Sequence, residues 1–301
     1  MNENPLVSVV VITYNSAKTI HETLDSIAAQ TYKNIELIIS DDCSKDETIS
    51  LCETWLSNNS ARFVRSLIVR TTKNSGVAPN LNNGIRASSG EWIKSVAGDD
   101  GLLSDAIENY VSYINTNPGC RIAYAKLHFF GNDKDRVKNA KLFYEQQYES
   151  IIKGDYETQF RAIHSGLFLP GPGVFVNKSL YDEVSGYDER YPFCEEYPFT
   201  YYVLEKGEKI HFVDKECYLY QIRTDSLCRQ GQENVMLHPR VFRDQYRFVK
   251  EVLFWKSIKH GFAIQGIKTL LTYYSTSSYY ETPNFVKRYL LNFLRLAYRM
   301  F

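Results

Sequence analysis

The sequence predicts an α/β fold in which a mixed, mainly parallel sheet is flanked by helices and followed by a C-terminal helical extension. Strand-like and helix-like patterns alternate over the first third of the chain, which is typical of a parallel sheet. The run VSVVVIT (7–13) is apolar without alternation, as expected for a strand buried on both faces. Polar clusters follow three of the four strands expected there, at the ends where open α/β sheets bind ligands.

Composition narrows the class of protein. The 35 basic and 35 acidic residues balance, which argues against nucleic acid as the main partner. Hydrophobic residues make up 44% of the 301, enough for one large core or two smaller ones. Six cysteines without metal-like or redox-like spacing indicate reduced thiols in a cytoplasmic protein. We find no signal-peptide pattern and no apolar stretch of the roughly 18 residues that a membrane span needs.

The elements of the first half follow from their patterns in chain order. Strands are predicted at 7–13, 35–40, 65–71 and 91–97. Helical spacing and capping residues predict a helix after each strand. The first helix is capped by Ser16 and directs Ile20, Leu24, Ile27 and Ala28 inward. The second is capped by Asp46 and directs Ile49, Cys52 and Leu56 inward. The third spans 80–87, and the fourth is capped by Ser104.

The alternation weakens from about residue 120. We expect a strand at 121–130, a charged loop at 131–141, and a glycine turn, a short strand and two short helices within 171–199. Two further strands are expected at 209–214 and 217–222. From Arg240 onward there are eleven basic and three acidic residues with interleaved aromatics, which predicts a basic, aromatic helical tail. The domains predicted are 1–230, divided into 1–105 and 106–230, and the extension 231–301.

Paired acids follow two of the strands. Asp41 and Asp42 end the second, and SVAGDD (95–100) brings Asp99 and Asp100 after the fourth. Either pair can be solvated turn residues. Alternatively, the first pair can bind a nucleoside, and the second can hold a divalent cation that offsets the charge of a diphosphate. Three segments that converge on one sheet edge favour a ligand crevice over isolated turns.

Two long segments carry a family resemblance. VSVVVITYNSAKTIHETLDSIAAQTYKNIELIISDDCSKDET and NSGVAPNLNNGIRASSGEWIKSVAGDD resemble family 2 glycosyltransferases, which have the Rossmann-like GT-A fold. The resemblance runs over about residues 5–225. It implies a nucleotide-diphosphate sugar as donor, Mg or Mn as cofactor, and inversion at the anomeric carbon.

The resemblance also implies roles for individual residues on the donor side. The nucleotide-sugar contacts that it implies are Thr13, Tyr14, Asn15, Asp42 at the base (typically uracil), Asn74, Gly76, Asn82, and Asp99 at the ribose or the metal. Asp100 corresponds to the direct metal ligand. Ala97 stands where many members have a further acid, and Leu81 where many have an arginine.

On the acceptor side, CEEYPF occupies the place of the family's catalytic acid pair. Glu196 corresponds to the base and Glu195 to its neighbour; the alternative is that both only complement a helix N-terminus. Gly171 and Gly173 of LPGPG correspond to a turn beside the acceptor, or form a tight turn only. Arg223 stands where relatives often carry a histidine; it would contact the diphosphate, or lie on the surface.

The resulting expectation is an inverting, metal-dependent transferase that moves a hexose from a nucleotide sugar, UDP-linked in the family's usual manner, to a hydroxyl. The acceptor would be a lipid-linked oligosaccharide or a surface polysaccharide such as O-antigen, capsule or exopolysaccharide. Residues 240–301 would hold the protein peripherally on the inner face of the cell membrane. Two alternatives stay open: a non-catalytic nucleotide-sugar-binding partner of an assembly complex, and a nucleotidyltransferase. The segment TYNSAKT lacks the glycine-rich phosphate loop that a nucleotidyltransferase would need.

Overall fold

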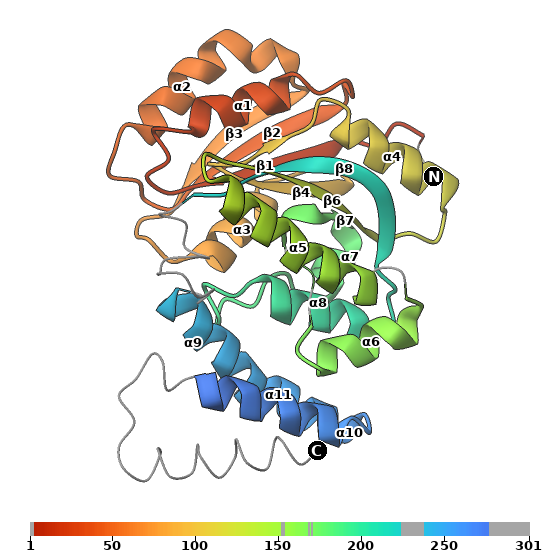
Figure 1. Cartoon of the computed structure of the whole chain (residues 1–301). Coiled ribbons are helices and arrows are strands. Elements are labelled where there is room, and N and C mark those ends of the chain that lie inside the picture. The colour runs from red at the N-terminus through yellow and green to blue at the C-terminus, as the bar shows by residue number, and fades with distance from the viewer. Residues whose placement is uncertain (1–2, 152–153, 168, 170, 224–237, 277–301) are drawn as a thin grey trace.

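The computed structural model describes residues 3–151, 154–167, 169, 171–223 and 238–276. Within these residues eight strands form one sheet in the order β3-β2-β1-β4-β7-β6-β8-β5 (Figure 1). The strands are β1 Val7–Thr13, β2 Ile35–Asp41, β3 Arg65–Arg70, β4 Trp92–Ala97, β5 Gly101–Leu102, β6 Ile122–Phe130, β7 Val174–Asn177 and β8 His211–Gln221. β1 to β4 pair in parallel, and β7 joins the two halves by antiparallel pairing with β4 and β6. The predicted mixed, mainly parallel sheet is confirmed.

Helices cover both faces of the sheet, and a helical group follows it. Figure 1 shows α1 and α2 together on one face of the N-terminal strands, with α3 on the other. The helices are α1 Ile20–Ala28, α2 Thr48–Asn59, α3 Val77–Arg86, α4 Ala106–Thr116, α5 Lys134–Ile151, α6 Tyr156–His164, α7 Lys178–Glu183, α8 Glu196–Glu205, α9 Pro239–Phe248, α10 Phe254–Lys259 and α11 Ala263–Thr276. Short 3-10 turns lie at Ser60–Arg62 and Gly171–Gly173, and a π-helical turn at Val249–Leu253 joins α9 to α10.

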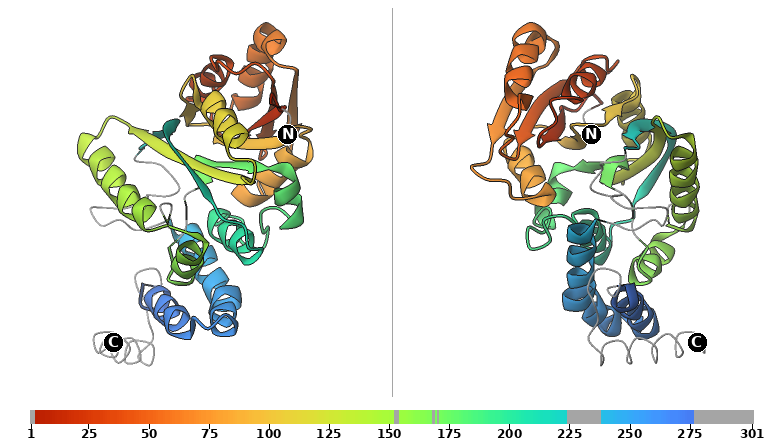
Figure 2. Two further views of the ribbon diagram at one scale, coloured as in Figure 1. Left: turned by 90° about the vertical axis from the view of Figure 1, so that its right-hand side faces the viewer. Right: turned by 60° about the vertical axis from the view of Figure 1, so that its left-hand side comes forward.

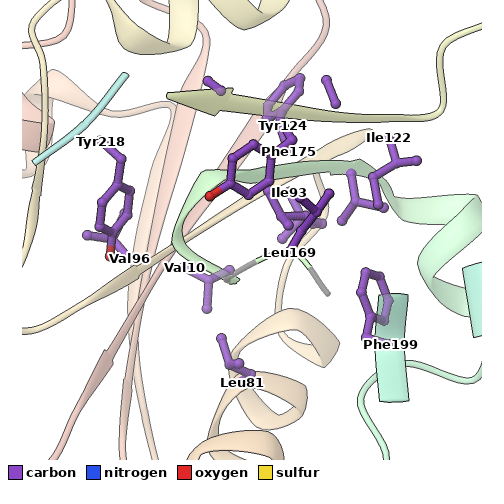
Figure 3. Packing of buried hydrophobic residues seen from close by; sticks show 14 of the residues in the cluster. Val10, Leu81, Ile93, Val96, Ile122, Tyr124, Leu169, Phe175, Phe199 and Tyr218 are labelled. Atoms are coloured by element: carbon purple, nitrogen blue, oxygen red, sulfur yellow. The ribbon is translucent and has the colours of Figure 1, made fainter. Parts of the chain in front are cut away.

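The core lies between the strands and these helices. Every residue of β2 is buried, as the run of apolar residues predicts for a central parallel strand. Figure 3 shows Val10 of β1 directed toward Leu81 of α3, so Leu81 serves packing and is only 4% exposed. The C-terminal helices α9 to α11 lie beyond α6 and α8, away from the N-terminal strands (Figure 2).

One prediction about the second half was wrong. Within the segment 131–141, expected to be a charged loop, residues 134–141 form the beginning of α5, and only 131–133 are non-helical. Val137, Ala140 and Tyr144 pack against the core at helical spacing, while the charged residues between them face solvent. The abundance of charge hid this narrow apolar stripe. The strands expected at 209–214 and 217–222 are one strand, β8, whose pairing with β6 shifts register near Lys126.

Several predicted helix starts were also displaced. α1 begins at Ile20 rather than after Ser16, whose carbonyl instead accepts the N–H groups of Thr19 and Ile20 in a preceding turn. α4 begins at Ala106, and the first-turn N–H of Ile107 is bonded to the Gln30 side chain rather than to Ser104. The helix expected at 80–87 begins three residues earlier. The N-termini of α3 and α4 are bonded to groups distant in sequence, the Pro192 carbonyl and the Gln30 side chain, which local capping rules cannot identify.

The C-terminal part of the chain is helical over 239–276, as expected. The predicted boundary at 230/231 and the tail 277–301 lie outside the described residues. No helix among the residues that the structure describes combines the length and apolarity that a membrane crossing requires.

The turn into β4 depends on a glycine. The buried Glu36 carboxylate of β2 accepts hydrogen bonds from the Gly90 N–H at 2.9 Å and from the Ser8 hydroxyl of β1. A Cβ at Gly90 would lie 2.7 Å from the Ser8 nitrogen and 2.8 Å from the Leu6 carbonyl oxygen. Both are backbone atoms of the sheet and cannot rotate away.

We therefore expect Gly90→Ala to lower the free energy of unfolding by about 1–3 kcal/mol, because it overpacks a rigid site. Gly119→Ala is the matched control, since a Cβ there meets nothing within 4 Å; its effect should stay within about 0.5 kcal/mol. Urea denaturation measures both. Equal stability of the two variants would show that the turn moves freely.

Candidate active site

The carboxyl ends of β1, β2 and β4 meet at one edge of the sheet. Thr13 pairs in register with Asp41, and Ile12 pairs with Ala97. The polar segments after these strands therefore begin side by side, as the sequence predicts. The alignment places the acids of the second and fourth strands along one edge, where open α/β sheets bind ligands.

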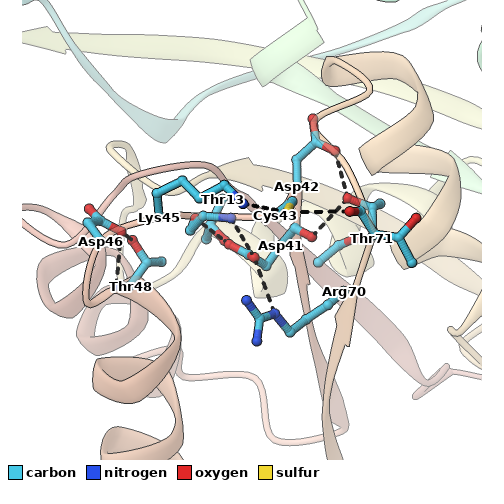
Figure 4. A network of polar contacts seen from close by, with 12 residues as sticks. Thr13, Asp41, Asp42, Cys43, Lys45, Asp46, Thr48, Arg70 and Thr71 are labelled. Carbon is cyan, nitrogen blue, oxygen red and sulfur yellow. Dashed lines mark hydrogen bonds and ion pairs between the residues drawn. The ribbon is translucent and has the colours of Figure 1, made fainter.

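The loops after β1 and β2 are fastened to each other (Figure 4). The N–H of Asn15 donates to Ser44 Oγ at 2.8 Å, and the N–H of Lys45 donates to Asn15 Oδ1 at 2.8 Å. Buried Asp41 accepts from the Thr13 hydroxyl at 3.1 Å and from the Ser44 N–H at 2.9 Å. Asn15 has a positive φ of 52°, a conformation that asparagine tolerates better than most residues. This frame leaves the Tyr14 side chain at the surface, where its ring is available for stacking.

Asp42 organises the loop that leads into α3. Its carboxylate accepts from the Ser75 N–H at 2.9 and 3.0 Å, the Gly76 N–H at 2.8 Å and the Thr71 hydroxyl at 2.9 Å. It is only 3% exposed. Gly76 is needed here because its φ is +103°. Asn74 is exposed at the tip of the same loop.

Asn82 and Asn80 have different places on α3. Asn82 Nδ2 donates to the Tyr187 carbonyl and to Glu189 Oε1, both at 2.8 Å, so its amide joins α3 to the segment after α7. Asn80 Nδ2 instead reaches the Thr13 carbonyl at 3.3 Å. The structure thus brings Asn80, rather than Asn82, to the first loop. No pattern in the sequence distinguished these two asparagines.

Asp100 is held in place by β8. Its Oδ1 accepts from the Gln221 N–H at 2.8 Å, and its Oδ2 from the Tyr218 hydroxyl at 2.9 Å. Burial, with the adjacent charge of Asp99, raises the pKa of Asp100 to about 8. Tyr218 and Gln221 escaped the sequence analysis because they lie more than a hundred residues away. Arg223 follows Gln221 by two residues, just beyond the end of β8.

The residues around Asp99 and Asp100 suit a divalent cation whose remaining ligands come from phosphate and water. Two adjacent carboxylates, one of them buried, are stabilised by positive charge. Gln221 Oε1 is buried without a hydrogen-bond partner, which leaves a neutral oxygen near the strand end that binds Asp100. Among the described residues no group of three or more His, Cys, Asp or Glu side chains could hold a metal. The arrangement suits an ion held by one or two carboxylates together with phosphate and water oxygens.

Glu195 and Glu196 are adjacent residues at the start of α8, and each is half-buried. Burial and the charge of Glu196 raise the pKa of Glu195 well above its usual range. Burial also raises the pKa of Glu196, while the hydrogen bonds from Glu195 and the Gly171 N–H favour its ionised form. The two adjacent carboxyl groups therefore disfavour being ionised at the same time.

The glycine turn packs directly beneath this pair. A Cβ at Gly171 would lie 3.2 Å from Glu196 Cγ, whereas a Cβ at Gly173 would run into the Tyr124 ring. Gly171 thus contacts the glutamates, and Gly173 serves packing. The buried ammonium of Lys94 donates to the carbonyls of Pro172 and, at 3.0 Å, Val174.

Lys94 also connects the two acid pairs. Its Nζ lies 4.7 Å from the ring centroid of Tyr218, whose hydroxyl binds Asp100. One buried cation therefore holds the turn under Glu196 and contacts the tyrosine that holds Asp100. The sequence analysis did not select Lys94, because a lysine in a strand usually lies on a solvent-facing side.

The Asp42 contacts generate a test. Asp42→Ala should lower the free energy of unfolding by about 1–3 kcal/mol, because buried N–H groups lose their acceptor. Amide exchange of Ser75 and Gly76 should accelerate in this variant. Asp42→Asn keeps one accepting oxygen, so its exchange rates should lie between those of wild type and Asp42→Ala. Hydrogen exchange read by mass spectrometry measures this. Unchanged exchange at 75–76 in the alanine variant would contradict the assigned role.

Solved structures share this fold. Staphylococcus aureus TarS 1-349 superposes with a TM-score of 0.64 at 18% identity, covering 94% of this chain and 76% of that one. TarS 1-349 is also solved in complex with UDP and with UDP-GlcNAc. The Pyrobaculum calidifontis mannosyltransferase PcManGT, solved with GDP-Man and Mn²⁺, has a TM-score of 0.56 at 17% identity over 99% of this chain and 84% of its own. At these identities the similarity establishes the GT-A fold.

Proteins similar in sequence are also glycosyltransferases. Glycosyltransferase GlyA of Streptococcus pneumoniae is 26% identical over 76% of this chain and 32% of its own length. The Escherichia coli UDP-Glc:alpha-D-GlcNAc-diphosphoundecaprenol beta-1,3-glucosyltransferase WfaP is 32% identical over 37% of this chain and 42% of its own. The alignments thus span less than half the length of either relative. Residues 8–184 match the family described as Glycosyl transferase family 2, and the chain belongs to that family.

Proposed function

We propose that this glycosyltransferase moves a hexose from a UDP-sugar to a hydroxyl of a lipid-linked oligosaccharide or a surface polysaccharide, with inversion and with help from a divalent metal. The observation that carries the proposal is that Lys94 contacts both the turn beneath Glu195–Glu196 and the tyrosine that binds Asp100. UDP and UDP-GlcNAc complexes of TarS support the donor class. The name of WfaP, which includes a diphosphoundecaprenol acceptor, supports the acceptor class.

On the donor side, Asp99 and Asp100 would hold Mg²⁺ or Mn²⁺, and the Mn²⁺ complex of PcManGT supports this choice. Such an ion offsets the negative charge that develops on the leaving diphosphate. Thr13, Tyr14 and Asn15 would line the nucleotide side, with the Tyr14 ring free to stack on a base. Asp42 would contribute through the loop it holds, and Arg223 would contact the diphosphate.

On the acceptor side, Glu196 would remove the proton from the attacking hydroxyl. The acceptor oxygen forms its bond to the anomeric carbon as the bond to the diphosphate oxygen breaks, and the proton passes to Glu196. Because the base and the leaving group lie on opposite faces of the sugar, one displacement inverts the configuration. Glu195 would orient Glu196, and the small Gly171 leaves room for the acceptor sugar.

The proposed catalytic domain spans 1–230, with the donor side in 1–105 and the acceptor side in 106–230. The extension 231–301 would attach the protein to the inner face of the cell membrane. Four large apolar side chains of α10 and α11 are exposed, Trp255 and Ile264 by 64% and 68%, together with Ile258 and Ile267. The exposed Lys259 belongs to α10 as well, whereas Lys256 is paired with Glu205 of α8. An apolar surface with an exposed cation suits an anionic membrane interface.

The first test is UDP release from a panel of UDP-sugars with Mg²⁺ or Mn²⁺ and lipid-linked acceptor extract. Glu196→Gln should lower kcat by about 10²- to 10⁴-fold, as expected when a general base is lost. Asp100→Asn should abolish the metal dependence. Glu53→Gln, an exposed glutamate on α2, is the matched control and should retain wild-type turnover.

The same assay distinguishes the proposed transferase from the non-catalytic alternative. Binding of a UDP-sugar without turnover in any acceptor extract would instead make the chain a non-catalytic nucleotide-sugar-binding partner. Absence of binding to every UDP-sugar would refute the nucleotide assignment.

The membrane attachment has its own test. Wild-type protein should co-sediment with vesicles that contain anionic lipid, and high salt should weaken the binding. The double variant Trp255→Ser and Ile258→Ser should bind at least about tenfold less, because it loses most of its interfacial area. Val64→Ser removes an exposed apolar residue from the other end of the molecule and should change nothing. Equal binding of all three proteins would exclude this surface as the contact.

A further inference from the structure

The segment 190–194, which leads directly into the glutamate pair, is held by the C-terminal helices. The N–H of Phe193, two residues before Glu195, donates to Asp244 Oδ2 of α9 at 3.0 Å. We propose that Asp244 is a positioning residue for Glu195 and Glu196, so that the C-terminal helices are part of the catalytic apparatus as well as a means of attachment. This inference rests on the proposed function of the glutamate pair.

The Asp244 carboxylate is a buried hydrogen-bond acceptor whose position is fixed by its surroundings. It is 1% exposed, although it carries a carboxylate. Arg243 Nε and Arg247 Nη1 lie 3.7 and 3.8 Å from its other oxygen and offset its charge. A buried carboxylate that accepts a backbone N–H forms a stronger and more directional bond than a neutral acceptor. The bond therefore fixes the backbone immediately before the glutamates.

Further contacts from the same helices reinforce this anchor. Arg247 Nη1 donates to the Arg190 carbonyl at 3.1 Å. The Tyr191 hydroxyl donates to Glu251 Oε2 at 3.0 Å, and Glu251 belongs to the π-helical turn. Such turns redirect side chains within a helix and occur often at functional sites.

The anchoring also continues past the glutamates. The Phe248 ring lies between Tyr191 and Tyr197, with centroid distances of 5.5 and 5.2 Å. Tyr197 directly follows Glu196, and all three rings are fully buried. The glutamate pair therefore has contacts with the α9 region on both sides in sequence.

The opposite side of the segment touches the donor loop. The Ala78 N–H of α3 donates to the Pro192 carbonyl at 3.1 Å. A Cβ at Gly76 would lie 2.7 Å from Pro192 Cβ, and the Gly76 N–H is held by Asp42. The segment thus lies between the loop held by Asp42 and the helix that carries Asp244. Its position sets the distance from the glutamates to the donor side.

Loss of Asp244 should therefore impair the chemical step more than donor binding. A misplacement of about 1 Å at a reacting group costs on the order of 10²-fold in rate. Asp244→Ala should lower kcat by about 10- to 100-fold, with the Kd for the UDP-sugar changed less than about threefold. Asp244→Asn keeps an acceptor oxygen and should restore most of kcat. Amide exchange at 193–197 should accelerate in the alanine variant only.

The experiment measures kcat, donor Kd by calorimetry and amide exchange on the full chain, with thermal unfolding to confirm that each variant is folded. Lys250→Gln, an exposed residue of the adjoining π-helical turn, is the control and should match wild type. Full activity of Asp244→Ala would overturn the proposal, as would an equal loss of kcat and donor binding in both Asp244 variants. If wild type itself shows no turnover, the proposed function fails; faster exchange at 193–197 in Asp244→Ala would still support the anchor, and unchanged exchange would overturn it.

Discussion

The arrangement of the candidate site depends on buried carboxylates that must find hydrogen-bond donors. A carboxylate removed from water is costly unless its oxygens are satisfied, and backbone N–H groups are the donors that a loop can offer. Asp41 binds Ser44, Asp42 binds Ser75 and Gly76, Asp100 binds Gln221, and Asp244 binds Phe193, each through a backbone N–H. Each acid thereby fixes one backbone segment of the candidate site. Acids whose charge suits a ligand therefore also shape the backbone that meets it.

The buried cation Lys94 complements these acids. It lies within the sheet, with its ammonium between the turn that precedes β7 and the ring of Tyr218. Burial lowers the pKa of Lys94 to about 7, and the nearby Asp100 counters that effect. A residue in this position couples the donor-side acids to the acceptor-side turn without itself reaching solvent. It links the proposed donor side to the proposed acceptor side through the core.

The sequence predicted the parts of this structure that depend on local pattern. The four parallel strands, and the polar clusters at their ends, follow from β-branched runs and their boundaries. The wrong assignment at 131–141 arose because charge obscured the stripe of Val137, Ala140 and Tyr144. The roles of Tyr218, Gln221 and Asp244 could not be predicted, because each acts through a contact more than fifty residues distant in sequence. Likewise, the basic tail suggested only a membrane contact, since its packing against the segment 190–194 is visible only in three dimensions.

The pH dependence of kcat/KM tests the central claim, that Glu196 of the half-buried glutamate pair acts as the base. The account predicts an acidic limb above the ordinary glutamate pKa of about 4.3, because activity is lost as Glu196 becomes protonated and its pKa is raised. Glu195→Gln, which still donates a hydrogen bond, should leave the limb in place. Glu195→Ala removes that donor and should move the limb to higher pH. A limb at the ordinary value, unmoved by either substitution, would contradict the account.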